Sequence, residues 1–118
     1  MKIETIRENY LFARAYKKGK SSVQKNLVVY LLKDHRRDAG FRVGFTVSKK
    51  QGGAVERNRV RRMLREAVRS VLALSPDLRQ SGVSLVIVAR SAAFDSGVKT
   101  GDISASLTRA LKSLGLVL

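Results

Sequence analysis

Residues 57–69 read Arg-Asn-Arg-Val-Arg-Arg-Met-Leu-Arg-Glu-Ala-Val-Arg, with six arginines and one glutamate in thirteen positions. Apolar residues recur through and beyond this stretch with the three- and four-residue spacing of one helical face. These apolar positions are Val60, Met63, Leu64, Ala67, Val68, Val71 and Leu72. Four arginines fall roughly opposite them: Arg61, Arg62, Arg65 and Arg69. The stretch therefore predicts a helix that packs one side on a core and holds a rigid row of guanidinium groups outward.

The composition of the chain points to a negatively charged partner. Its 118 residues are 44% hydrophobic, which fits one folded domain with a real core. Lys and Arg number 24 against 9 Asp and Glu, so the formal net charge is +15. Residues 36–69 hold 11 of the basic side chains and three of the acids. Such a concentrated surplus favours nucleic acid or an anionic surface, because each guanidinium can bind a phosphate through two hydrogen bonds.

The sequence also limits the cellular locations in which the protein is expected. There is no cysteine, so neither a disulfide framework nor a thiolate metal site is expected. No apolar run approaches the roughly 18 residues that span a bilayer, and residues 1–4 lack the apolar segment of a signal peptide. Lying on a membrane would need an exposed apolar face beside the arginines, and that face is expected in the core. We therefore expect a soluble, cytoplasmic protein with no membrane partner.

The patterns along the chain predict an α+β fold. Alternating Val43, Phe45 and Val47 indicate a half-buried strand, and the proline at position 76 interrupts the arginine helix. The expected helices cover residues 6–16, 54–74 and 103–114, and the expected strands cover residues 27–32, 42–48 and 83–89. A short further strand fits near residues 20–26. We expect Gly19 to end the first helix in a left-handed conformation, and Asp102 or Thr100 to cap the last one.

This α-β-β-α-β-α order predicts a single-domain α-β sandwich, with the helices on one face of a small sheet. The other sheet face is then expected to be partly uncovered. Thr46 and Ser48 fall on that face, and they are small and polar, as a wet binding surface would be.

Residues suited to catalysis are sparse. The only histidine, His35, lies in a charged loop at residues 33–40, where a solvated side chain is far commoner than a general base. The nine carboxylates are scattered, without a pair placed to hold two metal ions for phosphodiester cleavage. Gly52 and Gly53 lack the spacing and the Lys-Ser/Thr ending of a phosphate-binding loop. A nuclease that works through its own side chains is therefore not predicted.

What remains is binding chemistry. Phe12 and Tyr16 stand four residues apart on the first helix, and Tyr30 lies within a strand. Aromatic rings beside a basic groove are typical of single-strand binding, although packing in the core is the commoner role of such rings. For the arginines the alternative is a solvated helix face, but only Glu66 could pair with them. From the residues alone we predict binding to a nucleic acid, and both a general or ribosomal RNA-binding module and a basic DNA-binding domain stay open.

Longer motifs resemble one family. Residues 43–50 (VGFTVSKK), Gly52 and residues 54–66 (AVERNRVRRMLRE) are similar to the signature of the bacterial ribonuclease P protein subunit. Residues 12–20 (FARAYKKGK) resemble the first helix of that family, and residues 86–90 (VIVAR) resemble its last strand. The resemblance covers about residues 5–115 in the expected order.

The resemblance implies a fold and a division of labour. The fold would be ribosomal protein S5 domain 2-like, with a left-handed βαβ crossover that departs from the usual handedness. Residues 1–118 would form a single RNA-binding domain, without an obligate protein partner. A catalytic RNA subunit, holding most of the Mg²⁺, would cleave precursor tRNA to give the mature 5′ end. No residue of the protein would be catalytic or bind a metal ion.

The resemblance also implies roles for particular residues. The single-stranded 5′ leader of precursor tRNA would meet Phe12, Tyr16, Tyr30, Arg57, Asn58 and Arg61. The catalytic RNA would meet Lys49, Lys50, Arg59, Arg62, Arg65 and Arg69. The chain departs from the family where Tyr16 replaces a common phenylalanine and where Gln51 and Gly53 replace an apolar and a larger polar residue. We expect Gln51 and Gly53 to make the loop at residues 49–53 more flexible.

Overall fold

The computed structural model describes residues 4–5, 9–33, 41–80 and 82–116. Within them a sheet of five strands and three α-helices form one α+β domain. The strands are β1 (Glu4–Thr5), β2 (Lys20–Val23), β3 (Leu27–Lys33), β4 (Arg42–Thr46) and β5 (Val83–Ala89). The helices are α1 (Asn9–Lys18), α2 (Ala54–Leu74) and α3 (Thr100–Ser113), with 3₁₀ turns η1 (Pro76–Gln80) and η2 (Ser91–Phe94).

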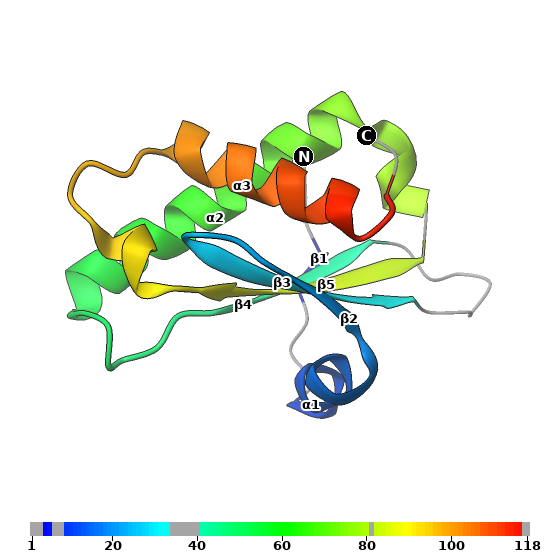
Figure 1. The fold of residues 1–118 in the computed structure, drawn as a ribbon, viewed down its shortest axis with the longest axis horizontal. Coiled ribbons are helices and arrows are strands. Elements are labelled where there is room, and N and C mark those ends of the chain that lie inside the picture. Colours follow the sequence, from blue (N-terminus) through cyan, green and yellow to red (C-terminus); the bar gives the residue numbers. More distant parts are fainter. Residues whose placement is uncertain (1–3, 6–8, 34–40, 81, 117–118) are drawn as a thin grey trace.

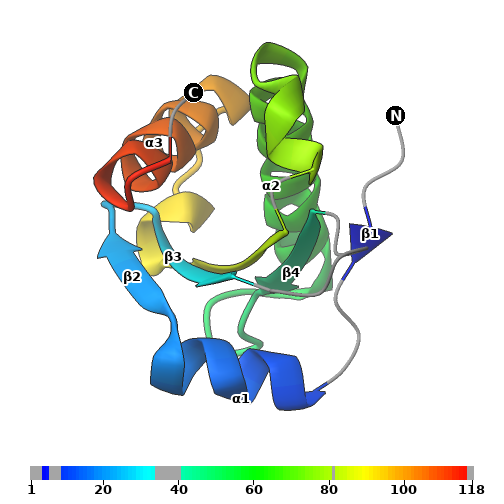
Figure 2. The same ribbon diagram turned by 90° about the vertical axis from the view of Figure 1, so that its right-hand side faces the viewer.

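The sheet is mixed, in the order β1-β4-β5-β3-β2. β4 runs parallel to both β1 and β5, whereas β3 is antiparallel to β5 and β2. The central strand β5 pairs in parallel with β4 on one side and antiparallel with β3 on the other. Helices α2 and α3 lie side by side on one face of the sheet, and α1 lies on the other (Figures 1 and 2).

The main core lies between the sheet and the pair α2 and α3. Leu85 and Ile87 of β5 point into it, and all seven predicted apolar positions of α2 are buried. Val86 and Val88 point to the opposite face, where Phe12 and Tyr30 pack against Val86. The predicted apolar face of the third expected stretch is confirmed, since Val43 and Val47 are buried in the main core and Phe45 packs against it, although β4 ends at Thr46 rather than at Ser48.

The prediction that the helices share one face is wrong for α1. Strand β5 is apolar on both faces, so Val86 offers a second surface on which the aromatic residues of α1 can pack. The open face is therefore partly covered, and α1 lies next to Thr46 rather than leaving it bare. The short strand expected near residues 20–26 is confirmed as β2, whereas the two-residue β1 was not predicted.

The ends of the helices differ from expectation in two places. Gly19 is not left-handed; positive φ among the described glycines occurs at Gly82 and Gly115. Strand β2 begins directly after Gly19, so the chain must become extended there. Gly115, at φ +89°, ends α3, and the amide of Leu116 donates to the carbonyl of Leu111.

The start of α3 involves one of the two predicted capping residues. The helix begins at Thr100, and Oδ2 of Asp102 accepts the backbone N–H of Lys99 at 2.8 Å. Asp102 therefore caps the helix from within its first turn. His35 and most of the charged loop at residues 33–40 lie outside the described residues.

Candidate nucleic-acid interface

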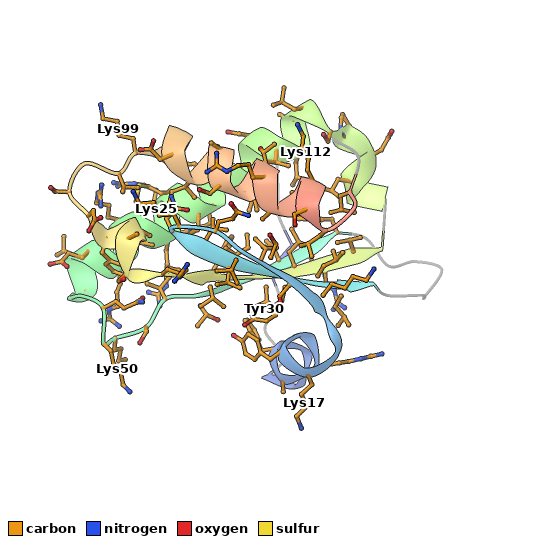
Figure 3. All side chains as sticks on the ribbon, in the orientation of Figure 1. Lys17, Lys25, Tyr30, Lys50, Lys99 and Lys112 are labelled. Carbon is orange, nitrogen blue, oxygen red and sulfur yellow. The ribbon has the colours of Figure 1, made fainter. Side chains whose placement is uncertain are left out.

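Three aromatic rings form a surface between α1 and the sheet, which we call the aromatic surface (Phe12, Tyr16 and Tyr30). Tyr30 points from the sheet toward α1 (Figure 3). The rings of Tyr16 and Tyr30 meet edge to face, with centroids 4.9 Å apart. Phe12 packs against Val86 beneath them. The sequence-predicted aromatics thus do come together, although they belong to two elements that are separated in the chain.

Tyr16 is the accessible member of this surface. Its side chain is 44% exposed, whereas Phe12 and Tyr30 are half-buried. Its hydroxyl lies 3.1 Å from Oγ1 of Thr46, so the ring is held against strand β4. A ring that is fixed at its edge and open on part of its surface suits base stacking, because little side-chain freedom is lost on binding. The core-packing role therefore describes Phe12 better than it describes Tyr16.

The arginines of α2 are mostly free of internal partners. Arg62, Arg65 and Arg69 are exposed and make no hydrogen bond or ion pair with any described residue. The carboxylate of Glu66 is engaged elsewhere, since its Oε2 accepts a hydrogen bond from Oγ1 of Thr100 at 3.1 Å. The row is therefore not a salt-bridged helix face. It presents positive charge that a polyanion could neutralise.

The first turns of α2 hold the remaining polar candidates. Asn58 is exposed, whereas Arg57 and Arg61 are half-buried. Nε of Arg57 lies 3.4 Å from the carbonyl of Gly53, which precedes the helix. A weak contact of this kind turns the guanidinium toward the start of the helix. Arg57 therefore lies close to the loop that joins β4 to α2.

Arg59 differs from the other arginines. It is half-buried, and Nη2 donates to the carbonyl of Val98 at 2.5 Å. Val98 lies 39 residues further along the chain, so no local pattern could have revealed this bond. Its predicted contact with RNA stays a prediction. The structure adds that this guanidinium ties α2 to the segment before α3.

The basic loop before α2 is held in place by Gln51. Lys49 and Lys50 are exposed, and Lys50 extends from the end of the molecule (Figure 3). With its amide nitrogen facing the carbonyl of Ala89, Gln51 donates to that carbonyl at 3.3 Å and accepts from the amide of Ser91 at 3.2 Å. Sequence reasoning associated Gln51 with added flexibility, whereas this geometry fixes the loop to the end of β5.

Gly52 is fixed by close packing. A Cβ at this position would lie 2.7 Å from Oε2 of Glu56 and 3.1 Å from the ring of Phe94. Glycine thus allows Phe94 to approach the backbone of the loop. A Cβ on Gly53, in contrast, would meet nothing within 4 Å.

Among the described residues, no three of His, Cys, Asp and Glu gather closely enough to hold a metal ion. No described helix is both long enough and apolar enough to cross a membrane. The candidate residues therefore offer binding groups for phosphate and bases, and these groups lie on two faces of the sheet.

The sequence of the chain was compared with known families and proteins. Residues 1–115 match the family model described as Ribonuclease P. The chain belongs to the ribonuclease P protein family. It is 40% identical to the ribonuclease P protein component of Clostridium botulinum (strain Loch Maree / Type A3), over 98% of both chains. The family resemblance seen in the motifs is thereby confirmed.

Solved structures of the family share this fold. The RNase P protein of Staphylococcus aureus superposes with a TM-score of 0.78 at 35% identity, covering 97% of each chain. The RNase P protein from Thermotoga maritima superposes with a TM-score of 0.72 at 24% identity, covering 90% of this chain and 93% of that one. The α+β architecture of this ribonuclease P family member is therefore shared with its relatives.

Arg59 and Arg62 allow a direct test of the difference between a held and a free arginine. Arg59→Ala removes the bond to Val98 and should lower the free energy of unfolding by about 1 kcal/mol. Arg62→Ala, at an exposed position where no described residue bonds to the side chain, should change it by less than about 0.5 kcal/mol. Urea denaturation of both variants measures the difference. Equal losses would show that the Val98 contact does not stabilise the fold.

Proposed function

We propose that this chain is the protein subunit of ribonuclease P. It binds the catalytic RNA and the 5′ leader of precursor tRNA, and it supports endonucleolytic removal of the leader to give the mature 5′ end. The observation that carries the proposal is that one chain presents both an exposed, fixed Tyr16 and a row of arginines on α2 (Arg62, Arg65 and Arg69) that have no partner among the described residues. Membership of the ribonuclease P family supports the same reading.

Each binding surface suits one of the two RNAs. The aromatic surface can stack the unpaired bases of a single-stranded leader, and Thr46 beside Tyr16 can hydrogen-bond to them. Arg57, Asn58 and Arg61, at the start of α2, extend this leader surface with phosphate and base contacts. The catalytic RNA takes the outward groups: Lys49, Lys50, Arg59, Arg62, Arg65 and Arg69. In this group Arg59 has the least freedom, because Val98 already accepts its hydrogen bond.

In the proposed function the RNA subunit, not the protein, cleaves the precursor. Mg²⁺, the cofactor expected of ribonuclease P, would supply charge neutralisation at the phosphate that is cut. The described protein residues do not fit a metal site of their own, because their carboxylates do not cluster. The protein therefore acts by binding and positioning, and none of its residues is proposed to be catalytic.

The finer features of the fold belong to the same proposal. We assign the chain to the ribosomal protein S5 domain 2-like group, with a left-handed β4-α2-β5 crossover. The parallel pairing of β4 with β5, which α2 joins, supports a βαβ unit at this place, and the left hand of the crossover rests on the family resemblance. We further propose that residues 1–118 form a single cytoplasmic RNA-binding domain that needs no protein partner.

Reconstitution tests the proposed function directly. The purified protein alone should leave precursor tRNA uncut, and addition of the bacterial RNA subunit at moderate Mg²⁺ should produce the mature 5′ end. Cleavage is followed by gel electrophoresis of end-labelled precursor. RNA binding without any effect on processing would instead identify a general RNA-binding module. Robust cleavage without the RNA subunit would contradict the proposal.

The arginine row predicts a change in salt dependence. Arg65→Ala should weaken binding to the RNA subunit and reduce the log–log salt slope by roughly 0.7–0.9, as expected for one lost phosphate contact. Filter binding at several salt concentrations measures the slope, and Ser70→Ala, on the same helix, serves as a neutral control. An unchanged slope for Arg65→Ala would remove this residue from the RNA-binding set.

The aromatic surface predicts selectivity for the leader. Tyr16→Ala should weaken binding of the holoenzyme to precursor tRNA by about 1–3 kcal/mol, if a base stacks on the ring, and should spare mature tRNA. Tyr16→Phe keeps the ring and loses only the hydroxyl beside Thr46, so most of the affinity should remain. Phe12→Ala should show the same preference with an added loss of stability. Equal losses for both tRNAs would favour a packing role.

A further inference from the structure

A concave site lies outside the residues assigned to the two RNA surfaces. It is a cavity of about 330 Å³ between the β2–β3 turn and the first half of α3. Its lining includes Lys25, Asn26, Asp95, Ser106 and Arg109. Lys25 can be seen at this end of the molecule, as can Lys99 at the start of α3 (Figure 3). The volume falls at the lower end of the range found for small-molecule sites.

Asn26 is the least expected residue of this cavity. Its side chain is only 5% exposed, yet its Oδ1 has no hydrogen-bond partner among the described residues. The backbone around it is fixed, because the carbonyl of Asn26 accepts the amide of Arg90 at 3.0 Å. Buried amides are nearly always hydrogen-bonded, since an unpartnered one lowers stability. On the cavity side this amide can still offer its nitrogen, Nδ2, as a donor to an acceptor on a ligand.

The charges around the cavity have opposite signs and are largely unpaired. The carboxylate of Asp95 and the ammonium of Lys25 have no partner within the described part of the chain. Arg109 is oriented by two weak contacts, from Nη2 to Oγ of Ser106 at 3.2 Å and from Nε to Oε1 of Gln24 at 3.5 Å. A matching ligand therefore carries N–H donors at one end and negative charge at the other.

We propose that this cavity binds a guanine nucleotide. Guanine presents adjacent N1–H and N2–H donors, which match the two oxygens of the Asp95 carboxylate. Its O6 lies beside these donors and can accept from the amide of Asn26. Lys25 and Arg109 provide the positive charge for the phosphate. Adenine and cytosine offer an amino group without an adjacent N–H donor, and uracil offers a single N–H. None of these three bases therefore binds a carboxylate through two hydrogen bonds.

The nucleotide has two sources that share this chemistry. It is either a free mononucleotide or an unpaired guanosine of a bound RNA, and only the second source rests on the proposed function. Val98 also lines the cavity, and its carbonyl holds Arg59. A nucleotide in this site therefore contacts the segment to which the arginine helix is tied.

Titration of the full-length protein with mononucleotides tests the site. Guanosine monophosphate should cause saturable NMR shifts in the amides of residues 25–26, 95–98 and 102–109. It should bind about tenfold more tightly than adenosine, cytidine or uridine monophosphate, as expected for one two-bond base contact. No saturable shift, shifts confined to α1 and residues 49–69, or equal affinity for all four nucleotides would each overturn the proposal.

Matched variants locate the bound nucleotide. Ala105 is exposed and lines the cavity, so Ala105→Phe should fill it and weaken binding of guanosine monophosphate about tenfold or more. Ala73→Phe, at an exposed position of α2, makes the same change away from the cavity and should bind normally. Asp95→Asn should reduce the preference for guanine while leaving binding of the other nucleotides unchanged. Unaltered binding by Ala105→Phe would overturn the proposal.

Binding to the RNA subunit separates the two sources. If Ala105→Phe weakens RNA binding relative to Ala73→Phe, the nucleotide comes from the RNA. If RNA binding is equal while guanosine monophosphate binding is lost, the ligand is the free nucleotide. A failure of precursor processing in the reconstitution assay would leave the titration interpretable, because it uses the protein alone.

Discussion

The packing of α2 on the sheet fixes the geometry of everything that is proposed to touch RNA. Seven apolar side chains of this helix are buried, and the six that are larger than alanine each contribute about 1.5–3 kcal/mol relative to exposure. Repulsion between like charges four residues apart on a helix costs only a few tenths of a kcal/mol per pair. Burial therefore dominates, and it sets the rotation of the helix about its axis. Once that rotation is set, the arginines have one direction in which to point.

The segment at residues 91–100 adds a second constraint. It is tied to α2 twice, by Arg59 to the carbonyl of Val98 and by Glu66 to the hydroxyl of Thr100. It also packs on the loop before α2, because the ring of Phe94 lies against Gly52. These contacts hold α2 at Arg59 and Glu66, and the loop before it at Gly52, to a segment outside the sheet. A phosphate-binding surface gains from such support, because less conformational freedom is lost when the RNA binds.

The sequence was sufficient where one periodicity dominates. The bounds of α2 and its buried residues were predicted correctly, because a helical pattern reports burial directly. The bounds of β5 were also predicted correctly, because a short and nearly continuous apolar run favours a buried strand. The placement of α1 was not predicted, since a continuous apolar strand does not reveal whether its second face is covered. The two-residue β1 is too short to carry any pattern.

At the candidate site, prediction from the sequence was incomplete for a different reason. Arg59 looks like its neighbours in sequence, and only the fold brings the carbonyl of Val98 to it. The partners of Gln51, Ala89 and Ser91, lie at and just after the end of a strand that is distant in sequence, so no local pattern shows that this side chain is held. Composition and spacing identify which residue types are present on a surface. They do not identify which of those side chains the protein has already engaged.

One strand connects the two proposed RNA surfaces. On the α1 side of the sheet, Thr46 at the end of β4 holds the hydroxyl of Tyr16. The chain then passes through the loop fixed by Gln51 and enters α2 on the other side. The distance between the leader surface and the arginine row is therefore set by a short, hydrogen-bonded segment rather than by a flexible linker. In the proposed function this rigidity is useful, because a leader held on one face is placed at a fixed distance from the catalytic RNA held on the other.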